Sequence, residues 1–400
     1  MIKKLPIFRV FARRLSSRPW SKSKVSIADN RAFGPSSKYK QELKYTVANE
    51  LANHTWQFDA ATVAKMLSPK KRKTPFDPRY LDTLEDYEDN TIDVEVLKKA
   101  VDSLKSTAKL PKSEFESKLY SPLCLFLNNC VQACQQALNT NKSEGYYKDL
   151  KFILWGRPMA DGVAGAKPLK PDFGGVDLEG LPETGFHLSW GSDYRLSLPG
   201  EVKKDWPELV CQAGMYARCL FNANPLRQFA LVLGYNHVKQ ELRFLIFHRG
   251  GLTSSLPLNP NSDAGRQDIL RIFFAILSWK TPADAGFPMW CNNSEMELPL
   301  STTSGDESTR VQVKKVLHRT LCIRGRAAQV SLVSMLNASQ TIGAFLALFF
   351  HISLLKSFRI QYQGHNLERN LKVANPRPLV RLRFSEFVLM QRCLLFQILI

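Results

Sequence analysis

Two apolar runs separated by a short polar turn constrain the fold of this chain more than any other feature. Residues 229–235 read FALVLGY and residues 242–248 read LRFLIFH, and the turn between them holds Asn236 and His237. Short, nearly continuous apolar runs bounded by turn residues predict strands buried within a sheet. The chain must therefore supply further strands and covering helices around this pair.

The neighbouring segments alternate between strand and helix patterns. We expect strands at 150–155 and 195–203 and helices at 206–222 and 265–278. A longer helix is expected at 112–138, where apolar residues recur every fourth position and Glu116 and Tyr120 lie one turn apart beside that stripe. This order predicts an α/β (α+β) fold with one mixed sheet flanked by helices.

Composition divides the 400 residues into six regions. In chain order they are a basic disordered tail at 1–45, a helix plus basic linker at 46–93, an α/β domain at 94–250, a helical extension and loop at 251–309, the start of a further lobe at 310–330, and an atypical apolar and basic tail at 331–400. The change of character after residue 330 leaves open whether 331–400 is a genuine product or a gene-model artefact.

The net charge of +19 is concentrated at the two ends of the chain. Such basic ends favour binding to nucleic acid or another polyanion, with solvated tails as the alternative. The PKKRK sequence at 69–73 is typical of a nuclear-import patch, so we expect a nuclear or cytoplasmic protein before a mitochondrial one. The apolar run at 341–355 is shorter than the roughly 20 residues that a membrane helix needs, so no transmembrane anchoring is expected.

The eight cysteines are scattered, without a CxxC pair or the Cys/His spacing of a zinc site. Free thiols in a reducing compartment are the expected state.

Acidic and basic residues at 172, 201 and 203 form a pattern that suits metal-assisted chemistry. Asp172 lies in the KPDFGG segment, and Glu201 and Lys203 are two residues apart on the strand expected at 195–203, where alternation places them on one face. Two carboxylates supply the oxygen ligands that Mg²⁺ prefers, and the amine can orient water or stabilise charge on a phosphate. On the following helix Gln212 and Tyr216 are one turn apart. A solvated Glu-x-Lys pair on a surface strand is the alternative.

This series of Asp172, Glu201-x-Lys203 and Gln212-xxx-Tyr216 resembles the PD-(D/E)xK nuclease superfamily, and its last part resembles the RecB and Cas4 branch. The resemblance implies a restriction-endonuclease-like fold at 94–250. It also implies that Asp172, Glu201 and Lys203 are catalytic, that Gln212 and Tyr216 support them, and that Glu116 joins Asp172 and Glu201 as a Mg²⁺ ligand. The fold also hosts members that bind without cleaving.

A second resemblance covers a longer part of the chain. A series of segments from residue 54 to 279 resembles the N-terminal region of the fungal-type protein kinase family. In chain order they are HTWQFDAATVAKML, ESKLYSPL, KPDF with GEVK, QAGMYARCLF, RQFALVLGY, LRFLIFHRGGLTSS and DILRIFFAILSW. In that family a nuclease-like region precedes a kinase domain. VLHRTLCIRGRAAQV at 316–330 resembles the entry to that domain, so 310–330 would begin a vestigial kinase lobe, with Gly325 and Arg326 in its nucleotide-binding hairpin.

The motifs that a kinase needs are missing after this entry. A phosphate-binding Lys, an HRD-type Asp and a DFG-type Asp should follow the glycine-rich strand. The first Lys after residue 330 is Lys356, no such triplets follow, and the DFG at 172–174 precedes the expected hairpin. We therefore expect a truncated family member that lacks kinase activity and does not bind ATP. Its nuclease-like fold would serve binding or regulation, and the partners include nucleic acid or other proteins. The alternatives are a Mg²⁺-dependent DNA nuclease using Asp172, Glu201 and Lys203, and a basic nucleic-acid-binding scaffold.

Overall fold

The computed structural model describes most of the first three quarters of the chain. The residues described are 3–4, 37–68, 94–105, 109–138, 145–155, 157–159, 169–179, 187–191, 196–224, 227–287, 291–292, 295–302, 305–319, 322–323, 329–335 and 345–349. The chain divides into two compact units, Met1–His351 and Ile352–Ile400, and all of these residues belong to the first.

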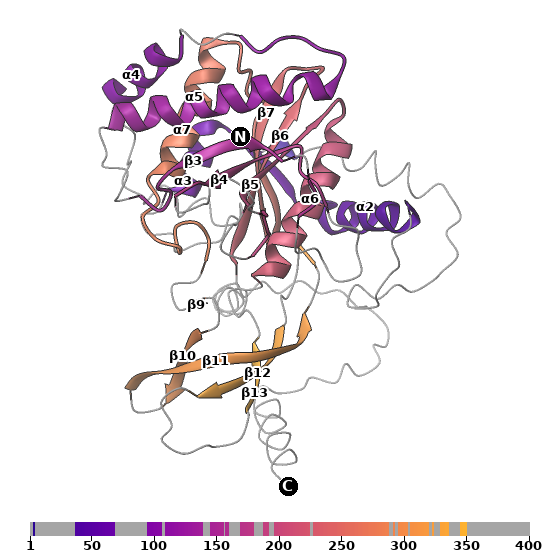
Figure 1. Ribbon diagram of the computed structural model, residues 1–400, viewed down its shortest axis with the longest axis vertical. Helices are drawn as coiled ribbons and strands as arrows, with labels where there is room; N and C mark the ends of the chain where they lie inside the picture. The colour runs from indigo at the N-terminus through magenta and orange to yellow at the C-terminus, as the bar shows by residue number, and fades with distance from the viewer. Residues whose placement is uncertain are drawn as a thin grey trace, which may run out of the picture. The chain divides into compact units, whose positions relative to one another are not determined.

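A mixed sheet forms the centre of the first unit (Figure 1). Its spatial order is β1 (Lys3–Lys4), β2 (Thr55–Phe58), β8 (Gly251–Ser255), β7 (Glu241–His248), β6 (Phe229–Asn236), β5 (Leu196–Lys203), β4 (Phe173–Asp177) and β3 (Leu150–Leu154). The pairs β2–β8 and β5–β6 are parallel and the other neighbours are antiparallel. The prediction of a mixed sheet in an α/β fold is confirmed.

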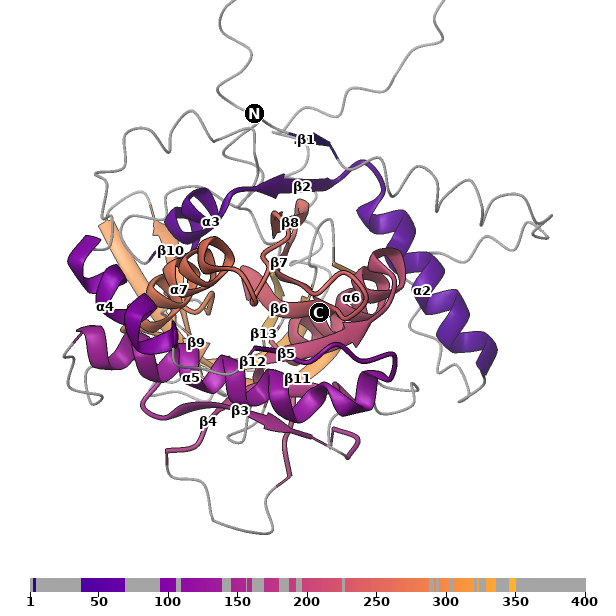
Figure 2. The ribbon, with the colours of Figure 1, turned by 90° about the horizontal axis from the view of Figure 1, so that it is seen from above.

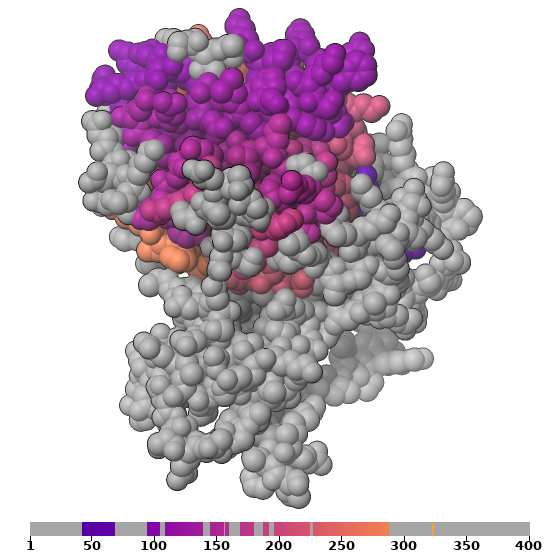
Figure 3. Space-filling model, viewed as in Figure 1, coloured from indigo at the N-terminus to yellow at the C-terminus, as the bar shows by residue number. Residues whose placement is uncertain are grey.

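Helices cover both faces of this sheet (Figure 2). One face carries α2 (Ser37–Leu51) and α6 (Trp206–Ala223), which the Lys44–Glu208 ion pair joins at 3.0 Å. The other face carries α3 (Ala60–Leu67), α4 (Val94–Lys105), α5 (Tyr120–Leu138) and α7 (Asp263–Leu277). In the space-filling view α4 and α5 form the upper surface of the described part (Figure 3).

The alternating direction of side chains along the central strands explains why helices cover both faces of the sheet. On β6 the side chains of Phe229, Leu231 and Leu233 join the core under α5 and α7, whereas Ala230 and Val232 join the core under α6. Successive side chains of a strand point to opposite faces, so an uninterrupted apolar run must be buried on both. The two apolar runs at 229–235 and 242–248 are confirmed as β6 and β7.

Several elements differ from the sequence prediction. The first helix already begins at Ser37, inside the expected tail at 1–45, and 55–58 is a strand within a segment expected to be helical. The expected loop after residue 250 contains β8, whose pairing with β2 extends the sheet beyond the predicted domain limits of 94–250. Pro122 lies in the first turn of α5, and the short 3₁₀ helix η2 (Glu116–Lys118) precedes that helix.

A second, antiparallel sheet of five strands follows in the sequence. Its order is β13 (Phe345–Phe349), β12 (Gln329–Met335), β11 (Gly305–Arg319), β10 (Glu295–Thr302) and β9 (Cys291–Asn292). The strand expected at 310–319 is confirmed within β11, whereas β10 forms where irregular structure was expected. Gly325, Arg326 and the basic patch at 69–73 lie outside the described residues.

Cys322 and Ile323 are anchored in the core of the central sheet. The Glu50 carboxylate accepts a hydrogen bond from the Ile323 N–H at 2.8 Å, and the Arg249 guanidinium donates to the Cys322 carbonyl at 2.6 Å. The Ile323 side chain is fully buried in the core under α2 and α6. A segment distant in sequence is therefore part of the hydrophobic core.

None of the helices in the described ranges is long and apolar enough to cross a membrane. The predicted apolar segment at 341–355 contributes β13, and the rest of it is not described.

Ile323→Ala should lower the free energy of unfolding by about 2–5 kcal/mol, because it leaves a cavity in the core. Denaturant unfolding followed by circular dichroism measures the change. The matched control is Val238→Ala, whose side chain is 67% exposed, and its effect should stay within about 0.5 kcal/mol. Equal stability of the two variants would contradict the anchoring role of Ile323.

Candidate functional site

The pairing of β4 with β5 brings Asp172 beside Glu201, although 28 residues separate them in the sequence. Phe173 is paired with Gly200, and the Asp172 N–H donates to the Gly200 carbonyl at 3.1 Å. The Asp172 Oδ2 accepts a hydrogen bond from the Val202 N–H at 2.9 Å. The long connection between the strands therefore does not separate the two carboxylates.

A close approach of the two strands requires glycine at position 200. A Cβ atom on Gly200 would lie 2.2 Å from Cζ of the Phe173 ring, well inside van der Waals contact. The Phe173 side chain is completely buried and cannot move aside without disturbing the core. Gly200 therefore permits the strand register that sets Asp172 next to Glu201.

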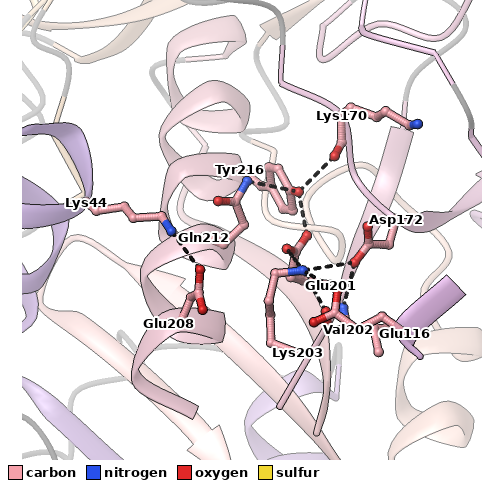
Figure 4. Close-up of polar contacts among 10 residues, drawn as sticks. All are labelled: Lys44, Glu116, Lys170, Asp172, Glu201, Val202, Lys203, Glu208, Gln212 and Tyr216. Atoms are coloured by element: carbon pink, nitrogen blue, oxygen red, sulfur yellow. Dashed lines mark hydrogen bonds and ion pairs between the residues drawn. The ribbon is translucent and has the colours of Figure 1, made fainter. Parts of the chain in front are cut away.

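The Lys203 ammonium lies at the centre of three carboxylates (Figure 4). Its Nζ atom is 2.9 Å from Glu201 Oε1, 3.0 Å from Glu116 Oε2 and 3.7 Å from Asp172 Oδ2. Glu201 and Lys203 alternate with Val202 on β5, so both point away from the core that Val202 joins. Three carboxylates against one ammonium leave an excess of negative charge when all are ionised.

Helix α6 supplies the two polar residues expected to support the site. The Tyr216 hydroxyl donates to Glu201 Oε2 at 2.5 Å and accepts from Gln212 Nε2 at 3.2 Å, and it also lies 3.0 Å from the Lys170 carbonyl (Figure 4). The Trp190 ring stacks on the Tyr216 ring with centroids 5.8 Å apart. Glu201 is thus held between Lys203 on its own strand and Tyr216 on the helix.

The start of α5 completes the cluster from the other side. Glu116 belongs to η2, and Tyr120, the first residue of α5, hydrogen-bonds the Asp172 carboxylate. The buried His237 ring bonds the Ser113 carbonyl through Nδ1 at 3.2 Å, and the His237 N–H donates to the Lys203 carbonyl at 3.2 Å. His237 therefore links the end of β5 to the segment that carries Glu116.

Burial and neighbouring charges shift the pKa values of Glu201, Lys203 and Tyr216. Burial, followed by the Asp172 charge, raises the pKa of Glu201 from 4.5 to about 7, although Lys203 and Tyr216 oppose the rise. Burial disfavours the charged Lys203, but the Glu201 and Asp172 carboxylates outweigh it and raise its pKa above the usual range. Burial and the neighbouring Glu201 keep the Tyr216 hydroxyl protonated by raising its pKa far above 10. A buried carboxylate with a pKa near neutrality is typical of functional sites.

The donor set fits a hard divalent cation once Lys203 withdraws. Within the described ranges, no three His, Cys, Asp or Glu side chains are already arranged to hold a metal ion. In the cluster the ammonium itself occupies the space between the carboxylates of Glu116, Asp172 and Glu201. Their oxygens are the ligands that Mg²⁺ prefers, and their excess negative charge favours a second positive charge.

The structure brings together six of the eight residues expected in a site: Glu116, Asp172, Glu201, Lys203, Gln212 and Tyr216. Gly325 and Arg326 are not described. Three residues at the site were not predicted for it, namely Tyr120, Trp190 and His237. Tyr120 could have been found from its spacing, because it lies one helical turn after Glu116. No sequence pattern indicated Trp190 or His237.

Comparisons with known protein families, with curated proteins and with solved structures gave no match. The resemblances to the nuclease superfamily and to the kinase family therefore stay predictions.

Wild-type protein should lose stability relative to Glu201→Gln as the pH rises from 5 to 8 in the presence of a chelator. In this window the folded state holds a proton on Glu201 that the unfolded state releases, so unfolding becomes easier with rising pH. The raised pKa of Glu201 corresponds to a loss of about 3 kcal/mol in the free energy of unfolding of the wild type relative to Glu201→Gln. Denaturant unfolding across the pH range measures it.

The control for this titration is Glu179→Gln, which removes an exposed carboxylate outside the cluster. Its unfolding free energy should follow the wild-type pH dependence. If the curve of Glu201→Gln also runs parallel to that of the wild type, Glu201 does not titrate in this window.

Proposed function

We propose that this chain carries a Mg²⁺-dependent site for phosphodiester cleavage, of the nuclease type. The observation that carries the proposal is the convergence of Glu116, Asp172 and Glu201 within 3.7 Å of the Lys203 ammonium. Solvated surface residues would not adopt this arrangement, because Glu201 is only 3% exposed and accepts a hydrogen bond from the buried Tyr216 hydroxyl. The sequence resemblance to the PD-(D/E)xK superfamily supports the same chemistry.

The protein's own residues have distinct tasks in this proposal. The Val202 N–H and the Tyr120 hydroxyl hold the Asp172 carboxylate, and Tyr216 fixes the orientation of Glu201. Lys203, which is 19% exposed, leaves its carboxylate partners and donates to a phosphate oxygen or to the attacking water. Glu116, at 31% exposure, is the most solvent-accessible of the three carboxylates.

Glu116, Asp172 and Glu201 would hold the metal ion. When bound, Mg²⁺ polarises the phosphodiester and lowers the pKa of its coordinated water. Binding also favours the ionised form of Glu201, because a cation beside a carboxylate lowers its pKa. Affinity for Mg²⁺ should therefore increase as the pH rises towards and beyond 7.

A second candidate function is binding without cleavage, within a regulatory region of the fungal-type protein kinase family. The ordered segments between residues 54 and 279 support that candidate. The ion pairs of Lys203 with Glu201 and Glu116 favour this candidate, because the ammonium neutralises part of the negative charge of the cluster without a metal.

Purified full-length protein should cleave DNA or RNA oligonucleotides with Mg²⁺ or Mn²⁺ and not with a chelator. Glu201→Gln and Lys203→Met should each lower the cleavage rate by roughly 100-fold or more, because the first removes a carboxylate that would hold the metal ion and the second removes the ammonium directed at the reacting phosphate. Gel assays with labelled oligonucleotides measure the rates.

The matched control is Glu208→Gln, which removes a carboxylate of α6 that pairs with Lys44 outside the cluster. It should keep wild-type activity. Absence of cleavage under all metals, with nucleic-acid binding retained, would reject the nuclease and leave the second candidate. Cleavage by Glu201→Gln at the wild-type rate would reject this site.

A further inference from the structure

An exposed aromatic side chain adjoins the carboxylate cluster. Phe115, the residue before Glu116, is 63% exposed to solvent. The other large apolar side chains that are exposed in the described part of the chain are aliphatic: Val94, Leu125, Leu154, Val238 and Leu256. Burying a phenyl ring is favourable, so this exposed ring can contribute binding free energy to a partner that covers it.

The segment that presents Phe115 is held in place by hydrogen bonds. The Phe115 N–H donates to Ser113 Oγ at 3.1 Å, and the Ser113 carbonyl is bonded to the buried His237 ring at 3.2 Å. His237 in turn donates its N–H to the Lys203 carbonyl. The position of Phe115 is therefore coupled to the strand end that carries Lys203, and a fixed platform loses little conformational entropy on binding.

Two lysines flank the ring in the sequence. Lys112 and Lys118 are both exposed, and the Lys118 ammonium lies 5.2 Å from the centre of the ring. The acids of the same segment are Glu114, which is exposed, and Glu116, which belongs to the carboxylate cluster. Each lysine can neutralise a phosphate of a bound strand and release its counterions.

We propose that Phe115, with Lys112 and Lys118, forms a base-stacking subsite for an unpaired nucleotide of a single-stranded nucleic acid. The proposal rests on the proposed function in one respect, since the strand's phosphate lies at the neighbouring Glu116–Lys203 cluster. An aromatic ring stacks on any base whose face is free. Within a duplex both faces are covered by neighbouring pairs, so the ring selects single strands, flaps or frayed ends.

The Phe115 ring and the Glu116–Lys203 cluster are close enough for one bound nucleotide to contact both. Consecutive Cα atoms are about 3.8 Å apart, so the Phe115 platform begins one residue from Glu116. The Glu116 carboxylate is 3.0 Å from the Lys203 ammonium (Figure 4). A base stacked on Phe115 thus leaves its own or the adjacent phosphate close to the cluster, while Lys112 and Lys118 follow the strand.

The test measures binding of the full-length protein to a fluorescein-labelled 12-nucleotide oligothymidylate and to a labelled duplex in a chelator, by fluorescence anisotropy. Phe115→Ala should weaken binding of the oligothymidylate about tenfold and leave duplex affinity within about twofold. Phe115→Trp should retain or strengthen single-strand binding, because a larger ring stacks at least as well. Circular dichroism confirms that the variants fold.

Leu125→Ala is the matched control, because it removes another exposed apolar side chain, 60% exposed, in a hollow between α4 and α5. It should leave both affinities unchanged. The proposal is overturned if Phe115→Ala binds the oligothymidylate as tightly as the wild type, or if its loss is equal on the duplex.

The same variants separate this subsite from the nuclease proposal. If Phe115 supports single-strand binding but no Mg²⁺-dependent cleavage occurs, the stacking subsite stands and the nuclease proposal fails. If the protein cleaves single strands and Phe115→Ala leaves both the affinity and the KM unchanged, the nuclease proposal stands and the subsite is rejected.

Discussion

The contact between Gly200 and the Phe173 ring is the constraint on which the site depends. The buried ring lies where a side chain at position 200 would be, so β4 and β5 approach in one register. A slip of one residue would move every side chain of a strand to the other face. Asp172 would then lose the Val202 N–H, and Glu201 would turn away from Tyr216 on α6. Backbone packing thus determines which charges meet.

The cluster is arranged at a cost to stability. Glu201 is almost wholly buried, and burial disfavours its ionised form even though Lys203 and Tyr216 both bond it. Apolar residues at these positions would pack in the sheet without the free-energy cost of burying charged groups. This cost supports the proposed function, because holding a cation beside a phosphate needs an excess of negative charge.

Much of this arrangement could be predicted from local patterns. The nearly continuous apolar runs at 229–235 and 242–248 identified the central strands, and the spacings of Glu201 with Lys203 and of Gln212 with Tyr216 placed each pair on one face. Contacts between distant segments could not be predicted. The pairing of β2 with β8, the anchoring of Ile323 by Glu50, and the link from His237 to Ser113 each depend on tertiary packing that leaves no periodic signal in the sequence.

The central claim is that the carboxylates around Lys203 form a cation site that the ammonium occupies until a metal replaces it. A crystal structure of the protein with Mn²⁺, recorded with anomalous scattering, tests this most directly. We expect an anomalous peak between the carboxylates of Asp172 and Glu201, with the Lys203 ammonium displaced from its contacts of 2.9 Å and 3.0 Å with Glu201 and Glu116. A structure at saturating Mn²⁺ with no peak there and Lys203 in its present position would contradict the account.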